Sequence, residues 1–295
     1  MKIAGIQFAC SAEKEKNTEK ALKMLSAAFS EGAKIICFQE LFNLFWFPKN
    51  RDEKVYEMAE SVEGKTVALF KNKIKGTDAV VILPIFEKAE EGYFNTSVVL
   101  QGDKIIGLYR KIHVTDIPLW EEKFYFSPGN TGFPVFETIH GKIGIQASWD
   151  NFYEGTRILR MNGADVIFAP TSCAFKSQHI WQTVISGNAI SNGVFIMRVN
   201  RVGSEEAQDF YGMSFCVNAE GELVGGPTGR ADSVLLADVD FDKLKQIRRE
   251  WPIMQERQPQ FYKDLSFHCS DYTDDVATKD GVIADDKNKN SGNNK

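Results

Sequence analysis

The chain has 295 residues, of which 43% are hydrophobic and 25% charged, and its formal net charge is −5 at pH 7. These values are typical of a globular protein and argue against a general nucleic-acid binder. No stretch has the apolar length of a membrane-spanning helix or of a signal peptide, and the five scattered cysteines, without a CxxC pair, indicate a reducing cytoplasmic setting rather than a disulfide framework or a zinc site.

The predicted elements alternate between strands and helices. Short apolar or alternating runs predict strands, and apolar residues three or four positions apart predict helices. In chain order, strands are expected at residues 2–8, 34–38, 79–86, 96–100, 104–109, 135–138, 142–147, 165–169, 194–199, 213–217 and 233–237. Helices are expected at residues 17–32, 55–75, 154–162 and 177–192.

The connections between these elements are of two kinds. Gln101-Gly102-Asp103 and His140-Gly141 predict hairpins, and residues 213–237 are interpreted as a last hairpin region, whereas helices separate other strands. This mixture indicates an α/β fold in which two sheets pack face to face with helices outside. Residues 1–269 are expected to form one domain, and the charged segment 270–295 is expected to be a disordered tail or to lie across an interface.

Three polar side chains stand at the ends of predicted strands, where active sites of layered α/β folds collect. Glu40 follows the strand 34–38, Lys111 the strand 104–109 and Ser148 the strand 142–147. Taken singly, a glutamate in such a place is usually a solvated cap, and a lysine usually reaches into solvent. Their order and spacing in one chain are the informative feature.

With this order and spacing, the chain resembles the nitrilase superfamily from about residue 2 to residue 264. The resemblance includes the segments around these three residues, Pro170-Thr171-Ser172, Asn200-Arg201-Val202-Gly203, Phe210-Tyr211-Gly212-Met213-Ser214 and the run 122–129. It implies a four-layer αββα sandwich that hydrolyses non-peptide carbon–nitrogen bonds without a metal or organic cofactor. It also implies Glu40 as the general base, Lys111 as the oxyanion partner, Glu122 as a second, positioning carboxylate and a cysteine nucleophile at position 148.

Ser148 departs from this pattern, because a serine hydroxyl is far less acidic than a thiol and normally needs a histidine relay. His113, the only histidine near a motif, is expected to be structural, and Cys173 is expected to be a packed thiol. We therefore expect the chain to be nearly inactive. Either it is a form inactivated to trap a substrate, which the retained Glu40, Lys111 and Glu122 favour, or it is a family member that has lost catalysis and binds a ligand.

The segment 111–126 resembles the corresponding segment of N-carbamoylputrescine amidohydrolases, because Asp116 follows Lys111 by five residues. This resemblance implies N-carbamoylputrescine as the substrate. An acid at this place would meet the free ammonium of such a substrate, and Glu121 and Glu154 are the next candidates. Phe42 and Trp46 are candidates for the wall of a narrow slot or, equally, for the core. The Trp149 N–H is expected to help bind the oxyanion.

Alternatives stay open. An N-carbamoyl amino acid or an aliphatic amide would be another substrate, and the carboxylate of the former would need a cation such as Arg157, Lys176 or Arg198. A catalytically dead binding protein on the same fold is the alternative from a different class. The resemblance also implies a homodimer or a larger homo-oligomer, and the apolar residues between Trp251 and Tyr262 suggest an interface.

Overall fold

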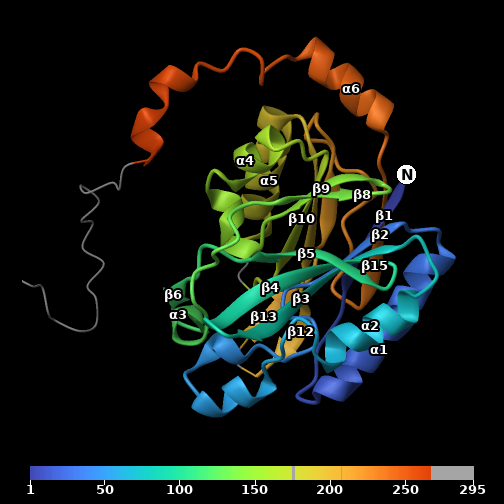
Figure 1. Ribbon diagram of the computed structural model, residues 1–295, viewed down its shortest axis with the longest axis vertical. Coiled ribbons are helices and arrows are strands. Elements are labelled where there is room, and N and C mark those ends of the chain that lie inside the picture. The colour runs from blue at the N-terminus through green and yellow to red at the C-terminus, as the bar shows by residue number, and fades with distance from the viewer. Residues whose placement is uncertain (175–176, 207, 267–295) are drawn as a thin grey trace, which may run out of the picture. The chain divides into compact units, whose positions relative to one another are not determined.

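The structure is a computed structural model that describes residues 1–174, 177–206 and 208–266 (Figure 1). Met1–Gln255 form one compact unit. The described part of the second unit, Glu256–Lys295, contains two short 3-10 helices at Pro259–Phe261 and Lys263–Ser266. The expected tail, 270–295, lies outside the described residues.

The first sheet contains β1 (Lys2–Gln7), β2 (Ile35–Phe38), β3 (Val80–Ala89), β4 (Gly92–Gln101), β5 (Lys104–Arg110) and β15 (Ser233–Asp238). Their order is β15-β1-β2-β3-β4-β5. β1, β2 and β3 run parallel, and β3, β4 and β5 form an antiparallel meander. The apolar side chains of the parallel strands are buried, as expected of strands covered on both faces.

The second sheet contains β8 (Val135–Thr138), β9 (Gly141–Ile145), β10 (Val166–Thr171), β11 (Phe195–Asn200) and β14 (Phe215–Val217), in the order β14-β11-β10-β9-β8. β9, β10 and β11 run parallel, so their C-terminal ends lie at one edge of the sheet. Helix α4 (Gly155–Met161) connects β9 to β10, and helix α5 (Gln178–Asn192) connects β10 to β11.

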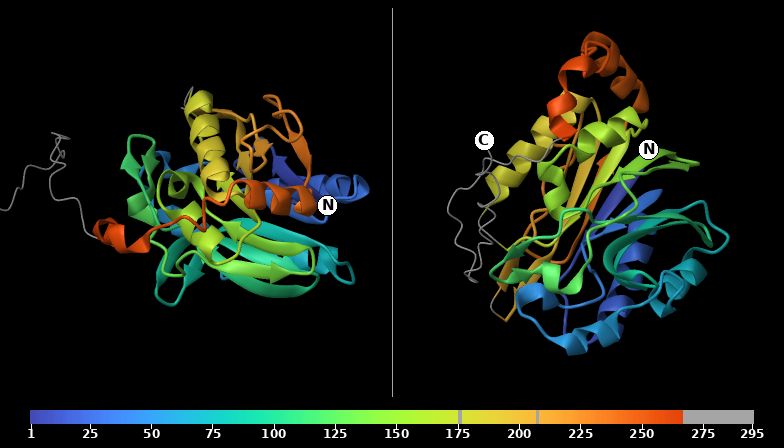
Figure 2. Two further views of the ribbon diagram at one scale, coloured as in Figure 1. Left: turned by 90° about the horizontal axis from the view of Figure 1, so that it is seen from above. Right: turned by 60° about the vertical axis from the view of Figure 1, so that its left-hand side comes forward.

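Three apolar layers hold the sheets and helices together. The inner layer lies between the two sheets and includes Ile3 and Val80 from one and Ile143 and Phe168 from the other. A second layer packs α1 (Lys14–Ser30) and α2 (Lys65–Ile74) on the outer face of the first sheet, and a third packs α4 and α5 on the outer face of the second. The fold is therefore a four-layer αββα sandwich, which confirms the predicted fold class (Figure 2).

The two sheets come into close contact at Gly5 of β1. A Cβ atom at this position would lie 2.7 Å from Val199 Cγ2 and 3.2 Å from Met197 Sδ, both on β11. A close-packed interior has no room for such an atom, so glycine permits the observed spacing of the sheets. This spacing in turn sets how near the strand ends of one sheet lie to those of the other.

Three differences between the observed and the predicted elements concern the larger elements. β14 and β15 do not form a hairpin, since they pair with β11 and β1 in different sheets. The expected helix 55–75 is divided into a 3-10 helix at Glu53–Met58 and α2, because Glu60 between them bridges to β3 and its carboxylate accepts the Thr66 N–H. Helix α6 (Phe241–Glu250), which Asp240 caps, was not predicted.

Two small hairpins also escaped the sequence-based prediction. One joins β6 (Asp116–Ile117) to β7 (Trp120–Glu121), and the other joins β12 (Val202–Glu205) to β13 (Gln208–Tyr211). Within the residues that the structure describes, no helix has the length and apolar character needed to cross a membrane.

Candidate active site

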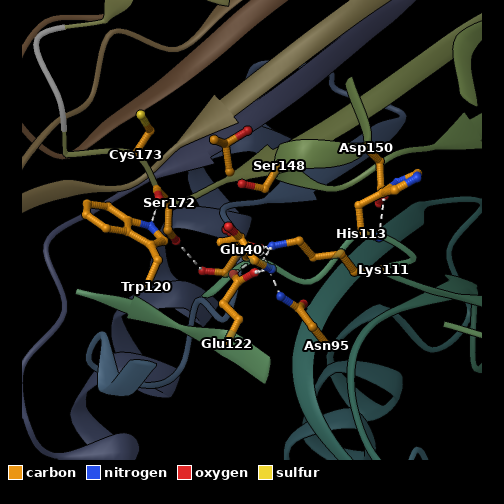
Figure 3. A network of polar contacts seen from close by, with 12 residues as sticks. Glu40, Asn95, Lys111, His113, Trp120, Glu122, Ser148, Asp150, Ser172 and Cys173 are labelled. Carbon is orange, nitrogen blue, oxygen red and sulfur yellow. Dashed lines mark hydrogen bonds and ion pairs between the residues drawn. The ribbon is translucent and has the colours of Figure 1, made fainter. Parts of the chain in front are cut away.

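Four polar side chains lie together in the interior (Figure 3). Glu40 follows β2, Lys111 follows β5, and Ser148 opens a short 3-10 helix that follows β9. Glu122 begins helix α3 (Glu122–Tyr125). All four are buried, with exposed fractions between 0% and 4%. The structure therefore brings together the four residues that the sequence analysis placed in one site.

The Lys111 ammonium joins two buried carboxylates. Its Nζ lies 2.6 and 2.7 Å from the two oxygens of Glu122 and 3.2 Å from Glu40 Oε1. Asn95 Nδ2 donates to the same Glu40 oxygen at 2.9 Å, and the Thr115 N–H donates to Glu122 Oε2 at 3.0 Å. One cation thus serves two carboxylates, and the trio carries a net negative charge when all three groups are ionised.

Burial and these charges shift two pKa values. Desolvation alone would lower the pKa of Lys111, but the Glu122 and Glu40 carboxylates outweigh it and raise that pKa. For Glu122, burial together with the Glu40 charge outweighs the effect of Lys111 and raises the pKa to about 7. Lys111 therefore stays charged at neutral pH.

Glu40 has one oxygen without a partner. Its Oε1 accepts from Asn95 and Lys111, whereas its Oε2 is buried and has no hydrogen-bond partner among the described residues. A buried polar atom left in this state costs roughly 1–3 kcal/mol unless a ligand or a nucleophile supplies a hydrogen. Chemically, this oxygen is a proton acceptor beside a fixed positive charge.

Ser148 has a backbone conformation that residues other than glycine rarely adopt, with a φ of +45°. Its carbonyl oxygen accepts a hydrogen bond from Asn151 Nδ2 at 2.8 Å, which stabilises the turn. A sharp turn of this kind after a strand presents the side chain at the edge of the sheet. Figure 3 shows the Ser148 side chain in the same part of the site as Lys111 and Glu40.

Asp150 joins the Ser148 turn to the Lys111 segment, and the sequence analysis did not identify it. Its buried carboxylate accepts hydrogen bonds from the Tyr109 hydroxyl and, at 2.9 Å, from the His113 N–H. His113 Nδ1 lies 2.5 Å from the same carboxylate, in keeping with a structural role for this histidine. Asp150 therefore fixes the position of Lys111 relative to Ser148.

Arg201 holds the loop that carries Glu40, and the only sequence signal for it was its place in a family motif. Its buried guanidinium donates to the carbonyl oxygens of Glu40 and Leu41 at 3.0 and 2.9 Å and to that of Leu44 at 3.0 Å. Glu205 pairs with it at 2.7 Å. Because Leu41 has a φ of +49°, these bonds stabilise a loop conformation that the backbone alone disfavours.

Two of the expected substrate contacts line a common cavity. Trp149 and Asp116 border a space of about 280 Å³, together with Lys123 and Tyr153. Asp116 is partly exposed there, and one of its oxygens lies 3.5 Å from Arg51 Nη2. The Asp116 carboxylate therefore has the Arg51 cation nearby but remains accessible to a ligand in the cavity.

The other expected contacts do not line that cavity. Phe42 is buried in the layer between the first sheet and its helices, against Phe38. Trp46 is buried beside Trp120, and its Nε1 donates to the Leu119 carbonyl at 2.9 Å. Glu154 is exposed at the start of α4. Core packing accounts for the position of Phe42.

Two other features were considered as parts of the site, the thiol of Cys173 and a metal ion. Cys173 is buried, and its Sγ accepts a hydrogen bond from Trp181 Nε1 at 3.1 Å. In the described part of the chain, no group of three or more His, Cys, Asp or Glu residues is arranged to hold a metal ion.

Comparison with known proteins identifies the family. The carbon-nitrogen hydrolase family matches residues 2–249. An N-carbamoylputrescine amidase from Solanum tuberosum is 35% identical over 281 residues, which cover 89% of this chain and 94% of that protein. A citrullinase from Francisella tularensis is 29% identical, with 90% and 98% covered. The chain belongs to the carbon-nitrogen hydrolase family of the nitrilase superfamily, which makes it an amidohydrolase.

Solved structures agree with this assignment. A carbon-nitrogen hydrolase from Helicobacter pylori G27 has a TM-score of 0.85 and 32% identity, covering 90% of this chain and 98% of that one. A mutant of the Nesterenkonia AN1 amidase, in which serine replaces a cysteine, has a TM-score of 0.73 and 21% identity, covering 85% and 97%. The second similarity shows the shared fold alone.

Replacing Lys111 with methionine is expected to lower the free energy of unfolding by about 3–5 kcal/mol at pH 8, because two buried carboxylates would lose their cation. The loss should be smaller at pH 5.5. Folding raises the pKa of Glu122, and removing Lys111, which lowers that pKa, raises it further. The folded variant therefore binds more protons than the folded parent, and its stability falls more steeply as pH rises. Urea denaturation at both pH values measures the effect.

The control is the double variant Lys111→Met, Glu122→Gln, which removes one of the two stranded charges. It should recover part of the loss at pH 8 and depend less on pH. Equal losses at both pH values would mean that Lys111 contributes packing rather than charge compensation.

Proposed function

We propose that the site hydrolyses the carbamoyl C–N bond of a ureido compound, N-carbamoylputrescine in particular. The observation that carries the proposal is the buried trio of Glu40, Lys111 and Glu122 beside the strained turn at Ser148. Two relatives are named N-carbamoylputrescine amidase and citrullinase, and both names refer to a compound with a carbamoylated amine.

In the proposed reaction, the active form has a cysteine at position 148. Glu40 Oε2 takes the thiol proton, and the thiolate adds to the carbamoyl carbon. The C=O electron pair moves onto oxygen, where Lys111 and the Trp149 N–H stabilise the negative charge. Collapse of this intermediate expels ammonia, which receives the proton from Glu40, and leaves a thiocarbamate on the sulfur. Water deprotonated by Glu40 then releases the thiol and a carbamate, which decomposes to CO₂ and the amine.

Glu122 is proposed to position Lys111 rather than to contact the substrate. Both of its oxygens lie closer to the Lys111 Nζ than Glu40 Oε1 does, at 2.6 and 2.7 Å against 3.2 Å. When Glu40 gains a proton during the reaction, its attraction for Lys111 weakens. The ammonium then stays in place because Glu122 still holds it.

Ser148 is proposed to stand where the nucleophilic cysteine belongs and to leave the site nearly idle. A serine nucleophile works with a histidine that accepts its proton. His113 Nδ1 lies 2.5 Å from Asp150, and its ring stacks on Tyr153. No hydrogen bond joins this ring to Ser148 among the described residues, so we propose that His113 is not that base. The chain would then bind a substrate while turning it over very slowly.

Ser148→Cys is expected to restore hydrolysis of N-carbamoylputrescine, measured as ammonia release. In this background, Glu40→Gln should lower kcat by roughly 10²–10⁴-fold, since it removes the proton acceptor and keeps the side-chain shape. Glu60→Gln is the control, because Glu60 is a partly buried glutamate paired with Lys14.

Two outcomes would contradict this assignment. Nearly full activity of the Glu40→Gln variant would show that another group is the base. A Ser148→Cys variant that binds a ureido ligand but releases no ammonia from any carbamoyl or amide compound would be a binding protein on this fold.

A specific observation favours a second substrate type, a ureido compound that carries a carboxylate. Arg198 of β11 is fully buried, and its Nε and Nη1 have no hydrogen-bond partner among the described residues. Its Nη2 donates to the Tyr211 hydroxyl at 2.9 Å, and the Trp181 ring lies 4.9 Å from the guanidinium. A buried cation in this state would favour a carboxylate partner. Of the other candidate cations, Lys176 lies outside the described residues, and Arg157 donates to the Ser191 carbonyl.

A panel of three ureas separates these substrate types in the Ser148→Cys background. Asp116→Asn should raise KM for N-carbamoylputrescine roughly 10- to 100-fold, equivalent to about 1.5–3 kcal/mol of charge-assisted bonding, and should affect neutral butylurea much less. Arg51→Met is the matched control, because it removes the cation next to Asp116 and should lower KM for the cationic substrate.

The third urea, N-carbamoyl-γ-aminobutyrate, carries a carboxylate in place of the ammonium. A preference for it that Arg198→Met abolishes would establish the second substrate type. Equal effects of Asp116→Asn on the cationic and neutral ureas would mean that Asp116 supports the β6–β7 hairpin rather than binding the amine.

We also propose that the chain forms at least a homodimer. Ile158 and Met161 of α4 and Ile180 of α5 expose 37%, 54% and 45% of their surface. Exposed apolar side chains on neighbouring helices are typical of an interface. Light scattering at micromolar concentration should give the mass of two or more chains, and a monomer would contradict the proposal.

A further inference from the structure

A cavity separate from the catalytic residues lies beneath α6 and the residues that follow it as far as Gln255. It encloses about 240 Å³, and Ile190 of α5, Ile247 of α6 and Met254 contribute apolar walls. Its volume exceeds the roughly 150 Å³ of a cavity that accepts benzene, so a ligand of about eight heavy atoms fits.

This cavity lies at the opposite end of the second sheet from Ser148. Arg248 in its lining pairs with Asp165 at 2.6 Å and donates to the Gly193 carbonyl at 2.8 Å. Asp165 and Gly193 precede β10 and β11, whereas Ser148 follows the C-terminal end of the parallel strand β9. At about 3.3 Å per residue, the length of β10 separates the two places by roughly 20 Å.

The cavity has more positive than negative charge available to a ligand. Arg248 is neutralised by Asp165, and Glu220, the acidic residue of the lining, lies 3.4 Å from Lys243. Arg160 also lines the cavity, and it forms no ion pair with any described residue; its Nε is buried without a hydrogen-bond partner. Burial and, after it, the neighbouring Arg248 lower the pKa of Arg160, and Asp165 offsets only part of this effect.

A second polar atom of the lining also has no partner. Asn192 is 4% exposed, and its Nδ2 donates to the Asn188 carbonyl at 2.8 Å and to Ser191 Oγ at 3.2 Å. Its Oδ1 is buried and has no hydrogen-bond partner in the described chain. Buried polar atoms are nearly always hydrogen-bonded, so two exceptions in the lining of one cavity point to a missing occupant.

We propose that this cavity is a second ligand site, which binds a small organic carboxylate with a short apolar chain. The carboxylate meets Arg160, the chain lies against Ile190, Ile247 and Met254, and Asn192 Oδ1 accepts a hydrogen bond from a water molecule that the carboxylate holds. The site is independent of the proposed hydrolysis, because none of the catalytic candidates contributes to it.

Isothermal titration of the full chain with three probes of equal length tests the proposal. Hexanoate should bind, hexan-1-ol should bind at least tenfold more weakly, and hexylammonium should not bind. Arg160→Met should weaken hexanoate binding at least tenfold without changing the affinity for hexan-1-ol. Arg160→Gln serves the same purpose if the methionine variant does not fold.

Two further variants locate the site. Ala219→Met fills the cavity from a buried lining position and should abolish binding of hexanoate and hexan-1-ol alike. Arg249→Met removes an exposed arginine of α6 that does not line the cavity and should leave all three affinities unchanged. The thermal midpoint of each variant without ligand establishes that it is folded.

Several results would overturn the proposal. Folded protein that does not bind hexanoate at millimolar concentration has no such site. Equal affinities for hexanoate and hexan-1-ol would show an apolar cavity without anion selectivity. Hexanoate binding that survives Ala219→Met would place the ligand elsewhere on the protein.

Discussion

The Lys111 ammonium and the carboxylates of Glu40 and Glu122 meet where all three side chains are buried, with Nζ–O distances of 2.6 to 3.2 Å. Removing each of these ions from water costs several kcal/mol, which is recovered only when they stay in close contact. Three chain segments must therefore converge with little tolerance. Glu40 Oε2 has no hydrogen-bond partner in the described part of the chain, and that oxygen is the one the proposed chemistry uses.

Two buried residues outside the trio maintain this convergence. Arg201 donates to three carbonyl oxygens of the loop that carries Glu40, and Asp150 binds the backbone and side chains on either side of Lys111. The loops contain Leu41 and Ser148 at positive φ, a conformation that persists only where surrounding contacts determine it. The strained positions are thus also the ones held by buried hydrogen bonds.

The two ends of the second sheet differ in their chemistry. The C-terminal ends of the parallel strands lie near the catalytic candidates, where carboxylates outnumber the lysine. The N-terminal ends lie near the cavity under α6, where Arg160 forms no ion pair with any described residue. The proposed hydrolytic site and the proposed anion site can occur in one sandwich, because the length of the strands separates the charges of the two sites. Apolar side chains fill the protein interior between the two sites.

The sequence by itself determined the class of fold and the four residues of the candidate site. The fold class could be predicted because apolar periodicity is a property of residues close together in the chain. The site residues could be predicted because Glu40, Lys111 and Ser148 each follow a strand within a short motif. Asp150 and Arg201 were not identified as site residues, since the parts of the site that they hold, at His113 and Glu40, lie 37 and 161 residues away along the chain. Phe42 and Trp46 belong to one aromatic run, yet they pack in different clusters. β14 and β15 looked like a hairpin but joined different sheets. Only the tertiary structure decided these contacts, packing partners and strand pairings. They join residues that are far apart in the chain, so they depend on which surfaces fit together once the sheets have packed.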